Sequence, residues 1–391
     1  MTNPRIVLKP GKENSLQRQH PWVFSGAIAQ AVLFDDQDLQ IGDWVDVVDH
    51  KERFLAKGHY SDGSIAVRIL SWANESPEAT YTQKIQAALS WRHRLGLPNP
   101  TTNAFRLIHG EGDLLPGLII DMYAQHAVVQ AHSWGIHRDL PLISQALQTA
   151  LPKLESIYSK SKAALHSSET QDHFLLGSSE SCQAQENGWL FGVNWVEGQK
   201  TGFFLDQRVN RALLAQYAQG KQILNTFCYT GGFSIAALKG GADFVKSVDV
   251  SSRAMAQTDA NIALNGFKNR HESITADALK YLSEDSDFYD IVVLDPPAFA
   301  KNLRKKHAAV MGYKRLNALG MKRVKPGGLL FTFSCSQVVD DELFRNTVTA
   351  AGLEAGRTAR VIHRLNQGPD HPEGLYHPEG HYLKGLVLAI D

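Results

Sequence analysis

The sequence predicts an α/β protein whose largest part is a parallel, doubly wound sheet preceded by two smaller domains. Four apolar β-type runs after about residue 195 alternate with amphipathic helical segments, which is typical of βαβ units. Residues 1 to about 75 instead alternate short β-type runs with turn signals. The segment between them mixes both patterns. We therefore expect domains at residues 1–75, 76–195 and 196–391.

The composition allows several cores and excludes some classes of protein. The chain has 391 residues, 43% of them hydrophobic, which is enough to bury two or three cores. Its 40 basic and 40 acidic residues cancel, so whole-chain charge indicates neither a nucleic acid nor a membrane as partner. Three irregularly spaced cysteines exclude a disulfide framework and a CxxC zinc site. With no apolar leader and no run of about 18 apolar residues, we expect a soluble cytoplasmic protein without a membrane partner.

The first domain is predicted as a small β-barrel or sandwich from the runs RIVLK, WVFSGAI, WVDVVDH and AVRIL. Pro10-Gly11, Gly42-Asp43 and Asp62-Gly63 provide turn signals around these runs. The polar stretch NESPEAT (74–80) is predicted as a linker, followed by a helix over 81–96. A strand at AVVQAHS and a helix around LPLISQALQTALP then indicate a small α+β domain.

A cofactor site is predicted at the end of the first strand of the third domain, in NTFCYTGGFSIAAL. The Gly231-Gly232 pair lets a ligand approach the backbone, and the following helix N-terminus favours negative charge. Taken alone, the pair would equally suit a tight turn. Asp249 closes the next strand, where a carboxylate accepts hydrogen bonds from ribose, and Asp277 occupies the third expected position.

The ligand predicted for this crevice is S-adenosylmethionine. The loop lacks the G-x-G-x-x-G pattern of dinucleotide sites, so a ligand with adenine and ribose but no pyrophosphate fits best. The cofactor-binding candidates from these strand ends are Asn225, Phe227, Tyr229, Gly231, Asp249, Asp277, Ala278 and Asp295.

The run DIVVLD leads into Asp295-Pro296-Pro297-Ala298-Phe299, an arrangement typical of nucleobase methyltransferases. The two prolines fix the backbone and remove two amide donors, which leaves a rigid ledge beside the cofactor. A strand stopped by prolines is the plainer alternative. In enzymes that methylate exocyclic amines the aromatic residue follows the prolines directly, whereas Ala298 intervenes here.

Cys335 is the candidate nucleophile. It follows the run GLLFTF, which should neighbour DIVVLD and end on the same edge of the sheet; the KPGG turn (325–328) is predicted to precede that strand. Carbon 5 of a pyrimidine is a poor nucleophile until a thiolate adds to carbon 6. The alternative is that Cys335 is inert and buried, as most cysteines at such positions are. The Asp295 ledge on the same edge favours the nucleophile.

Residues 301–325 contain nine Lys or Arg and no acid, so we expect this run to neutralise RNA phosphates, although a charge run is often only a solvated face. The first twenty residues are also basic. The predicted RNA-binding residues are Phe299, Lys301, Arg304, Lys305, Lys306, Lys314, Arg315, Lys9, Lys12 and Arg18. The histidines His363, His371, His377 and His381 are interpreted as loop residues, and no metal is predicted.

These segments together resemble the bacterial large-subunit ribosomal RNA cytosine-C5 methyltransferases over nearly the whole chain. The resemblance implies an N-terminal PUA domain, a central α+β domain and a Rossmann-like class I methyltransferase domain. It also implies that Cys335 is the nucleophile, that Asp295 hydrogen-bonds the base at N3, and, weakly, a homodimer. It places Lys200, Thr201, Phe203 and Asp206 near the methionine end of S-adenosylmethionine. The segments that carry it are HPWVFSGAI, FRLIHGEGDLLPGLIID, KTGFFLDQR, NTFCYTGGF, DPPAF, GYKRLN, FSCS and PEGHYLKG.

The function expected is therefore formation of 5-methylcytosine in 23S ribosomal RNA. The alternatives are methylation of a base nitrogen in guanine or adenine, methylation of uracil at carbon 5, and a non-catalytic RNA-binding factor of ribosome assembly. The cofactor-loop residues argue against the last of these.

Overall fold

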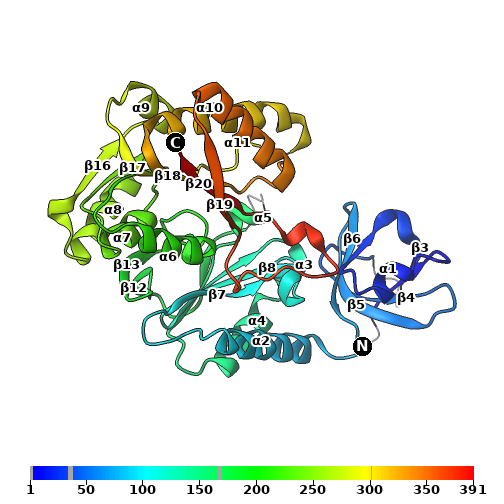
Figure 1. Cartoon of the computed structure of the whole chain (residues 1–391). Coiled ribbons are helices and arrows are strands. Elements are labelled where there is room, and N and C mark those ends of the chain that lie inside the picture. Colours follow the sequence, from blue (N-terminus) through cyan, green and yellow to red (C-terminus); the bar gives the residue numbers. More distant parts are fainter. Residues whose placement is uncertain (1–2, 34–37, 166–169, 301) are drawn as a thin grey trace. The chain divides into compact units, whose positions relative to one another are not determined.

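The computed structural model describes residues 3–33, 38–165, 170–300 and 302–391, and it divides into two compact units (Figure 1). The first unit comprises Met1–Ala184, Val193–Phe203 and Pro369–Gly380. The second comprises Gln185–Gly192, Phe204–Gly368 and His381–Asp391. The three domain boundaries expected from the sequence stay a prediction. Within the described ranges, no helix has the length and apolar character needed to cross a lipid bilayer.

The first unit begins with a six-stranded sheet in the order β2-β6-β5-β4-β1-β3, which confirms the small β domain. Alternate residues of its strands face a common core that includes Ile6, Val45, Val47 and Val67. This inward alternation is what the β-type runs predicted. The strands are β1 (Arg5–Leu8), β2 (Trp22–Phe24), β3 (Ile28–Val32), β4 (Trp44–Val48), β5 (Phe54–Tyr60) and β6 (Ile65–Ser71), with the short helix α1 (Asn14–Gln17).

A five-stranded sheet in the order β11-β10-β9-β8-β7 follows in the same unit. Helices α2 and α4 pack against each other and share the core of this sheet. The strands are β7 (Ala104–His109), β8 (Leu118–Tyr123), β9 (His126–Ala131), β10 (Ser156–Ser159) and β11 (His173–Leu176). The helices are α2 (Pro77–Arg94), α3 (Trp134–Arg138), α4 (Leu140–Ala150) and α5 (Lys162–Leu165), with the 3-10 turn η2 (Gly110–Asp113).

The prediction of a linker over residues 74–80 is wrong for residues 77–80, because α2 begins at Pro77. Ser76 caps the helix, since its hydroxyl accepts a hydrogen bond from the Ala79 amide at 3.3 Å. Proline at the first helical position fits this start, because its missing N–H would have no partner there. A serine followed by a proline was thus a helix start rather than a linker.

The second unit contains a seven-stranded sheet in the order β16-β15-β14-β17-β18-β20-β19, which confirms the doubly wound prediction. Strands β14 to β18 are parallel to one another, and β20 is antiparallel to both of its neighbours, β18 and β19. The strands are β14 (Gln222–Thr226), β15 (Phe244–Asp249), β16 (His271–Thr275), β17 (Tyr289–Leu294), β18 (Val324–Ser334), β19 (Ala359–Leu365) and β20 (Lys384–Ile390). A separate pair, β12 (Ser181–Glu186) and β13 (Trp189–Asn194), precedes this sheet in the chain.

Helices cover both faces of this sheet. Figure 1 shows α6, α7 and α8 on one face and α9, α10 and α11 on the other, and α10 packs along α11. Both faces of the central strands are therefore buried, which is why their sequences are continuously apolar. The helices are α6 (Arg208–Tyr217), α7 (Gly232–Lys239), α8 (Ser252–Leu264), α9 (Ala278–Glu284), α10 (Lys306–Arg323) and α11 (Asp341–Ala355).

The KPGG segment lies inside β18 rather than before it, so that part of the prediction is wrong. Tyr289 pairs with Val324, but Ile291 pairs with Leu329, which leaves the residues between them as an irregularity in the ladder. The strand therefore starts at Val324 and is interrupted near its beginning. The carboxyl end of β18, which matters for the site, is where the sequence placed it.

The strand register brings the predicted site segments to one edge of the sheet. Thr226 pairs with Leu294, and Leu294 pairs with Thr332, in one row across β14, β17 and β18. Val248 of β15 belongs to the same row through Thr226. The glycine loop, the Asp-Pro-Pro segment and the cysteine all follow this row within a few residues, at the carboxyl ends where ligands bind in such sheets.

Candidate active site

Cys335 is the first residue after β18, and it is partly exposed rather than packed in the core. Its sulfur lies 3.9 Å from the carbonyl oxygen of Pro296, the residue after Asp295. The cysteine and the Asp-Pro-Pro ledge are thus neighbours on one edge of the sheet. This placement is the one that a nucleophile acting on a base beside Asp295 requires.

The two serines that flank Cys335 fix its backbone. Ser334 and Ser336 are buried, with 0% and 1% of their surfaces exposed. The Ser336 amide donates to the Ser334 hydroxyl at 3.3 Å, and the Ser336 hydroxyl donates to the Ala300 carbonyl at 2.8 Å. The second bond ties the cysteine segment to the end of DPPAF, so both sides of the candidate site are held together.

Asp295 is oriented by a side chain that the sequence did not single out. Gln207 donates a hydrogen bond from Nε2 to Oδ1 of Asp295 at 3.0 Å. Gln207 is itself held by Asn210, whose Nδ2 donates to its Oε1 at 2.6 Å. Gln207 ends the 3-10 turn η3 (Leu205–Gln207) and Asn210 lies in α6. The only feature of the sequence that pointed to Gln207 was its position in the KTGFFLDQR segment.

Asp206 lies beside Gln207 in the same turn and is buried. Its Oδ2 accepts a hydrogen bond from the Tyr382 hydroxyl at 2.7 Å. Tyr382 comes from the PEGHYLKG segment, which lies more than 170 residues away in sequence. The assignment of Asp206 to the methionine end of the cofactor stays a prediction.

The glycine loop has a strained backbone. Phe227 and Tyr229 adopt positive φ angles of 56° and 49°, which non-glycine residues rarely do. Gly231 has φ +80°, and a Cβ there would lie 2.8 Å from Cγ2 of Thr258. Thr258 also holds the loop, because its hydroxyl donates to the Tyr229 carbonyl at 2.8 Å. A side chain at position 231 would therefore strain the backbone and force Thr258 or the loop to shift.

Asp249 braces the same loop. Its Oδ2 accepts from the Tyr229 amide at 3.0 Å, and its Oδ1 accepts from the Ser251 amide at 2.9 Å. Asp277 is the exposed N-cap of α9, and its Oδ1 accepts from the Lys280 amide at 2.8 Å. Ala278 is buried at the first position of that helix. Asp277 therefore has a capping role, and its contact with a cofactor stays a prediction.

Asn225 offers the clearest test of whether the crevice suits S-adenosylmethionine. Its Nδ2 donates to Ser234 Oγ at 2.8 Å, but its Oδ1 is buried and has no hydrogen-bond partner among the described residues. A buried carbonyl oxygen without a donor is costly. The polar groups of an adenosyl ligand provide donors, and the Gly231 turn leaves room for one beside the backbone. These residues fit the cofactor.

The remaining cofactor candidates, Lys200, Thr201 and Phe203, belong to the first unit. The Thr201 hydroxyl donates to Asp121 at 2.6 Å and lies 3.1 Å from the Tyr123 hydroxyl, so it is already engaged there. Phe203 is buried, and Lys200 is exposed with a positive φ of 49°. Their assignment to the cofactor stays a prediction.

Phe299 and Tyr313 form an aromatic pair next to Cys335. Their ring centroids are 4.6 Å apart, and Phe299 also packs closely over Gly312 of α10. Burial is the main cause that raises the pKa of Tyr313 to about 12, and the nearby Cys335 and Asp295 act in the same direction. Phe299 is thus a supported ring at the site, and Tyr313 is a neighbour that the sequence analysis did not name.

The basic run contains two kinds of side chain. Arg304, Lys305 and Arg315 are exposed, which suits the predicted phosphate contacts. Lys314 instead pairs with Glu354 at 2.8 Å, so much of its charge is neutralised. Lys306 is half-buried at the start of α10. Lys301 lies outside the described residues.

In the first unit, Lys9, Lys12 and Arg18 are exposed, and Lys9 donates to the Gly26 carbonyl at 3.0 Å.

The interpretation of the four histidines as loop residues is wrong for His363, which lies in β19 and whose Nε2 is 2.7 Å from the Tyr217 hydroxyl. Among the residues that the structure describes, no three His, Cys, Asp or Glu side chains are grouped to bind a metal.

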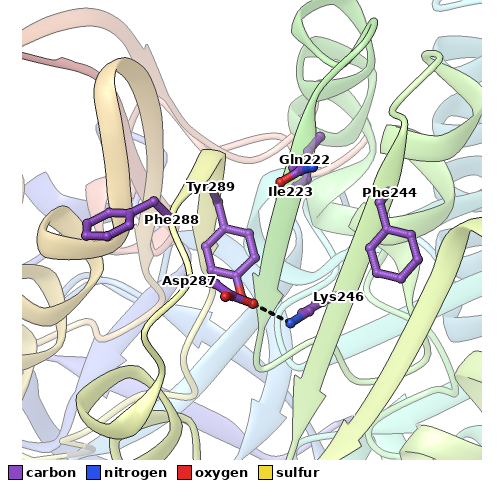
Figure 2. A pocket seen from close by; sticks show the side chains of 7 residues that line it. All are labelled: Gln222, Ile223, Phe244, Lys246, Asp287, Phe288 and Tyr289. Carbon is purple, nitrogen blue, oxygen red and sulfur yellow. Dashed lines mark hydrogen bonds and ion pairs between the residues drawn. The ribbon is translucent and has the colours of Figure 1, made fainter.

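A hollow of about 280 Å³ lies at the amino ends of β14, β15 and β17 (Figure 2). Figure 2 shows Lys246 and Asp287 paired across it, at 2.7 Å. This hollow is on the sheet edge opposite to Cys335 and Asp295. The candidate active site lies at the carboxyl edge, where the candidate catalytic groups and the strained glycine loop are.

Comparison with known proteins gives matches over the whole chain. Residues 6–72 match the PUA-like domain family, and residues 167–384 match the S-adenosylmethionine-dependent methyltransferase family. The ribosomal RNA large subunit methyltransferases I of Alteromonas mediterranea and Shewanella denitrificans are 40% and 39% identical to it. Each alignment spans 99% of this chain, with 98% and 99% of those proteins covered.

Solved structures share the fold. A SAM-dependent methyltransferase from Streptococcus mutans superposes with a TM-score of 0.82 at 23% identity, over 100% of both chains. A methyltransferase complexed with SAH gives a TM-score of 0.83 at 23% identity, again over 100% of both chains. At this identity the likeness shows the fold alone.

Proposed function

Because the chain belongs to the ribosomal RNA large subunit methyltransferase I family, we propose that it methylates carbon 5 of a cytosine in large-subunit (23S) ribosomal RNA. The cofactor is S-adenosylmethionine, which supplies an electrophilic methyl group when bound. The observation that supports the carbon-5 reaction most directly is the 3.9 Å approach of the Cys335 sulfur to Pro296, beside Asp295.

Cys335 acts as the covalent nucleophile. Its thiolate forms a bond to carbon 6 of the base, and the electron pair of the C5–C6 double bond moves so that carbon 5 becomes enamine-like. After carbon 5 has taken the methyl group, its proton passes to solvent, and β-elimination restores the C5–C6 double bond and releases the Cys335 thiolate. The protonated carboxyl of Asp295, whose Oδ1 accepts a hydrogen bond from Gln207, donates a hydrogen bond to N3 of the base and so stabilises the negative charge that develops on the ring during attack.

The glycine loop and the strand ends hold the cofactor. Asn225 and Asp249 offer acceptors at the ends of β14 and β15, and Gly231 allows close approach of the backbone. Extruding the target base from its stack costs a few kcal/mol. Phe299, supported by Tyr313, provides an aromatic surface, and Arg304 and Lys305 provide phosphate contacts that offset this cost. We place the enzyme in the cytoplasm, with its ribosomal RNA substrate; the homodimer stays a prediction.

Substitution of Cys335 by alanine tests the covalent mechanism. Ribosomal RNA from a strain lacking the gene is incubated with the enzyme and S-adenosylmethionine, and nucleoside mass spectrometry measures 5-methylcytidine. We expect activity to fall at least a thousandfold for Cys335→Ala and to be retained by the matched Cys182→Ala. Activity of Cys335→Ala within a few-fold of the wild type would contradict the proposal and favour methylation of a base nitrogen. A product of 5-methyluridine would show that the target is uracil.

A further inference from the structure

Lys384, the first residue of β20, is a buried cation behind the candidate nucleophile. Only 3% of its surface is exposed. It is the cross-strand partner of Ser334, the residue before Cys335. Its Nζ donates to the carbonyl oxygen of Ser336, the residue after Cys335, at 2.9 Å. The lysine side chain therefore spans the segment that presents the thiol.

The ammonium has little compensation for its burial. Its hydrogen-bond acceptor is a neutral carbonyl, and within the described part of the chain no carboxylate lies within 4 Å of it. Burial lowers the pKa of Lys384, while Asp341, Cys335 and Asp340 raise it. A buried charge without a close counterion is expensive.

Among the described residues, titratable groups that lie near Cys335 or act on Lys384 come from four elements. Asp295 follows β17, Tyr313 lies in α10, and Asp340 and Asp341 start α11, while Lys384 lies in β20. The first four are acids; Asp295 and Tyr313 lie near Cys335, where their negative forms disfavour a thiolate, while Asp340 and Asp341 act on Lys384. Lys384 supplies the positive charge in this set, and a nearby cation is what favours the thiolate form of a cysteine.

We propose that Lys384 is a positioning residue that holds Cys335 in its thiolate form and fixes the Ser334–Ser336 segment for attack on the base. The inference rests on the proposed covalent role of Cys335. With the thiolate already formed, attack makes the sulfur–carbon 6 bond and moves the ring electron pair to carbon 5, and no proton has to leave the sulfur at that step. The ammonium keeps its protons throughout.

The test measures thiolate formation directly, without RNA. Full-length protein is treated with iodoacetamide across a series of pH values, and peptide mass spectrometry follows alkylation of Cys335. We expect the Cys335 profile of Lys384→Met and Lys384→Gln to move to higher pH by about one unit. Lys384→Arg, which keeps the charge, stays near the wild-type profile. Binding of S-adenosylmethionine and the thermal transition are measured for each variant to establish that it is folded.

Two controls make the result specific. Lys57→Met removes another buried lysine whose Nζ donates to a backbone carbonyl, that of Glu75 at 3.1 Å, and it should leave the Cys335 profile unchanged. Cys182, whose pKa burial raises to about 12, reports general opening of the protein in the same samples.

If the Cys335 profiles of folded Lys384→Met and Lys384→Gln coincide with the wild type, the inference is wrong and the lysine only anchors Ser336. That outcome is separate from failure of the proposed function, which Cys335→Ala decides by loss or retention of methylation.

Discussion

The sulfur of Cys335 lies 3.9 Å from the carbonyl oxygen of Pro296, so two segments 39 residues apart in sequence form one face. The contact exists because β17 and β18 are adjacent and parallel, with Leu294 paired to Thr332. A thiol that is partly exposed at this position can reach a base held beside Asp295. The predictions below test the groups that build this edge of the sheet.

Gly231→Ala should weaken binding of S-adenosylmethionine by at least tenfold. The added Cβ would lie 2.8 Å from Thr258 Cγ2, and φ is +80°, so the loop is strained and either it or Thr258 must shift. Isothermal calorimetry measures the affinity. The matched control is Gly266→Ala, at φ +81° with nothing within 4 Å, which carries the same backbone strain without the clash. Equal losses of affinity in the two variants would mean that the Gly231 turn has no special role.

Ser336→Ala should lower the free energy of unfolding by about 1–3 kcal/mol, because the buried Ala300 carbonyl loses its donor. It should also reduce the methylation rate, since the bond holds the Cys335 segment to DPPAF. Thermal or urea denaturation gives the stability. Ser283→Ala is the control, because its hydroxyl also donates to a backbone carbonyl, that of Lys280, on an exposed part of α9. If both variants lose the same stability and the same methylation rate, the Ser336 bond has no special role in holding the Cys335 segment.

Replacing Arg304 and Lys305 together by glutamine should weaken RNA binding and reduce the slope of log affinity against log salt by about 2. Both side chains are exposed in the run that follows the Asp-Pro-Pro ledge. Lys314→Gln should change the slope less, because Glu354 already neutralises that lysine at 2.8 Å. Filter binding or fluorescence anisotropy at several salt concentrations provides the slopes. If the double substitution leaves the slope of log affinity against log salt unchanged, these residues do not contact RNA phosphates and are only a solvated surface.

The free energy of unfolding should decrease at acid pH because His271 becomes protonated. Burial lowers the pKa of this histidine from 6.5 to about 4, so its neutral form is favoured in the folded chain. Between these two pH values the unfolded chain binds a proton that the folded chain does not, and stability decreases as the pH falls through this range. The loss amounts to at most about 3 kcal/mol. Above pH 6.5 this contribution is fully present.

Unfolding experiments from pH 7 to pH 4 test this dependence. His271→Gln should be less sensitive to acid than the wild type, because glutamine keeps a polar partner for Ser247 but does not titrate. The exposed His50→Gln should follow the wild-type curve. If His271→Gln loses stability as steeply as the wild type does, another group is responsible. The hydrogen-bond chain from His271 through Ser247 and Ser234 reaches Asn225, so acid should also disturb the cofactor crevice.

Tertiary packing decided the supporting residues of the site. Gln207 reaches Asp295 from 88 positions away, and Tyr382 reaches Asp206 from 176 positions away. Lys384 reaches Ser336 only because β20 inserts antiparallel beside β18. No local sequence pattern predicts such contacts for a glutamine, a tyrosine or a lysine in a loop or at a strand end. Their roles depend on which strands become neighbours.

The sequence by itself determined the doubly wound sheet, the edge that carries the candidate site and the residues that follow the strand ends there. Strand ends are marked locally, by apolar runs that stop at Gly231, Asp249, Asp295 and Cys335, and parallel strands end on one edge by geometry. Only the tertiary structure decided that the thiol approaches Pro296, that Gln207 orients Asp295 and that a buried ammonium lies behind the cysteine. The physical reason is that these are single contacts between distant segments, which depend on strand order and side-chain packing rather than on any periodic pattern.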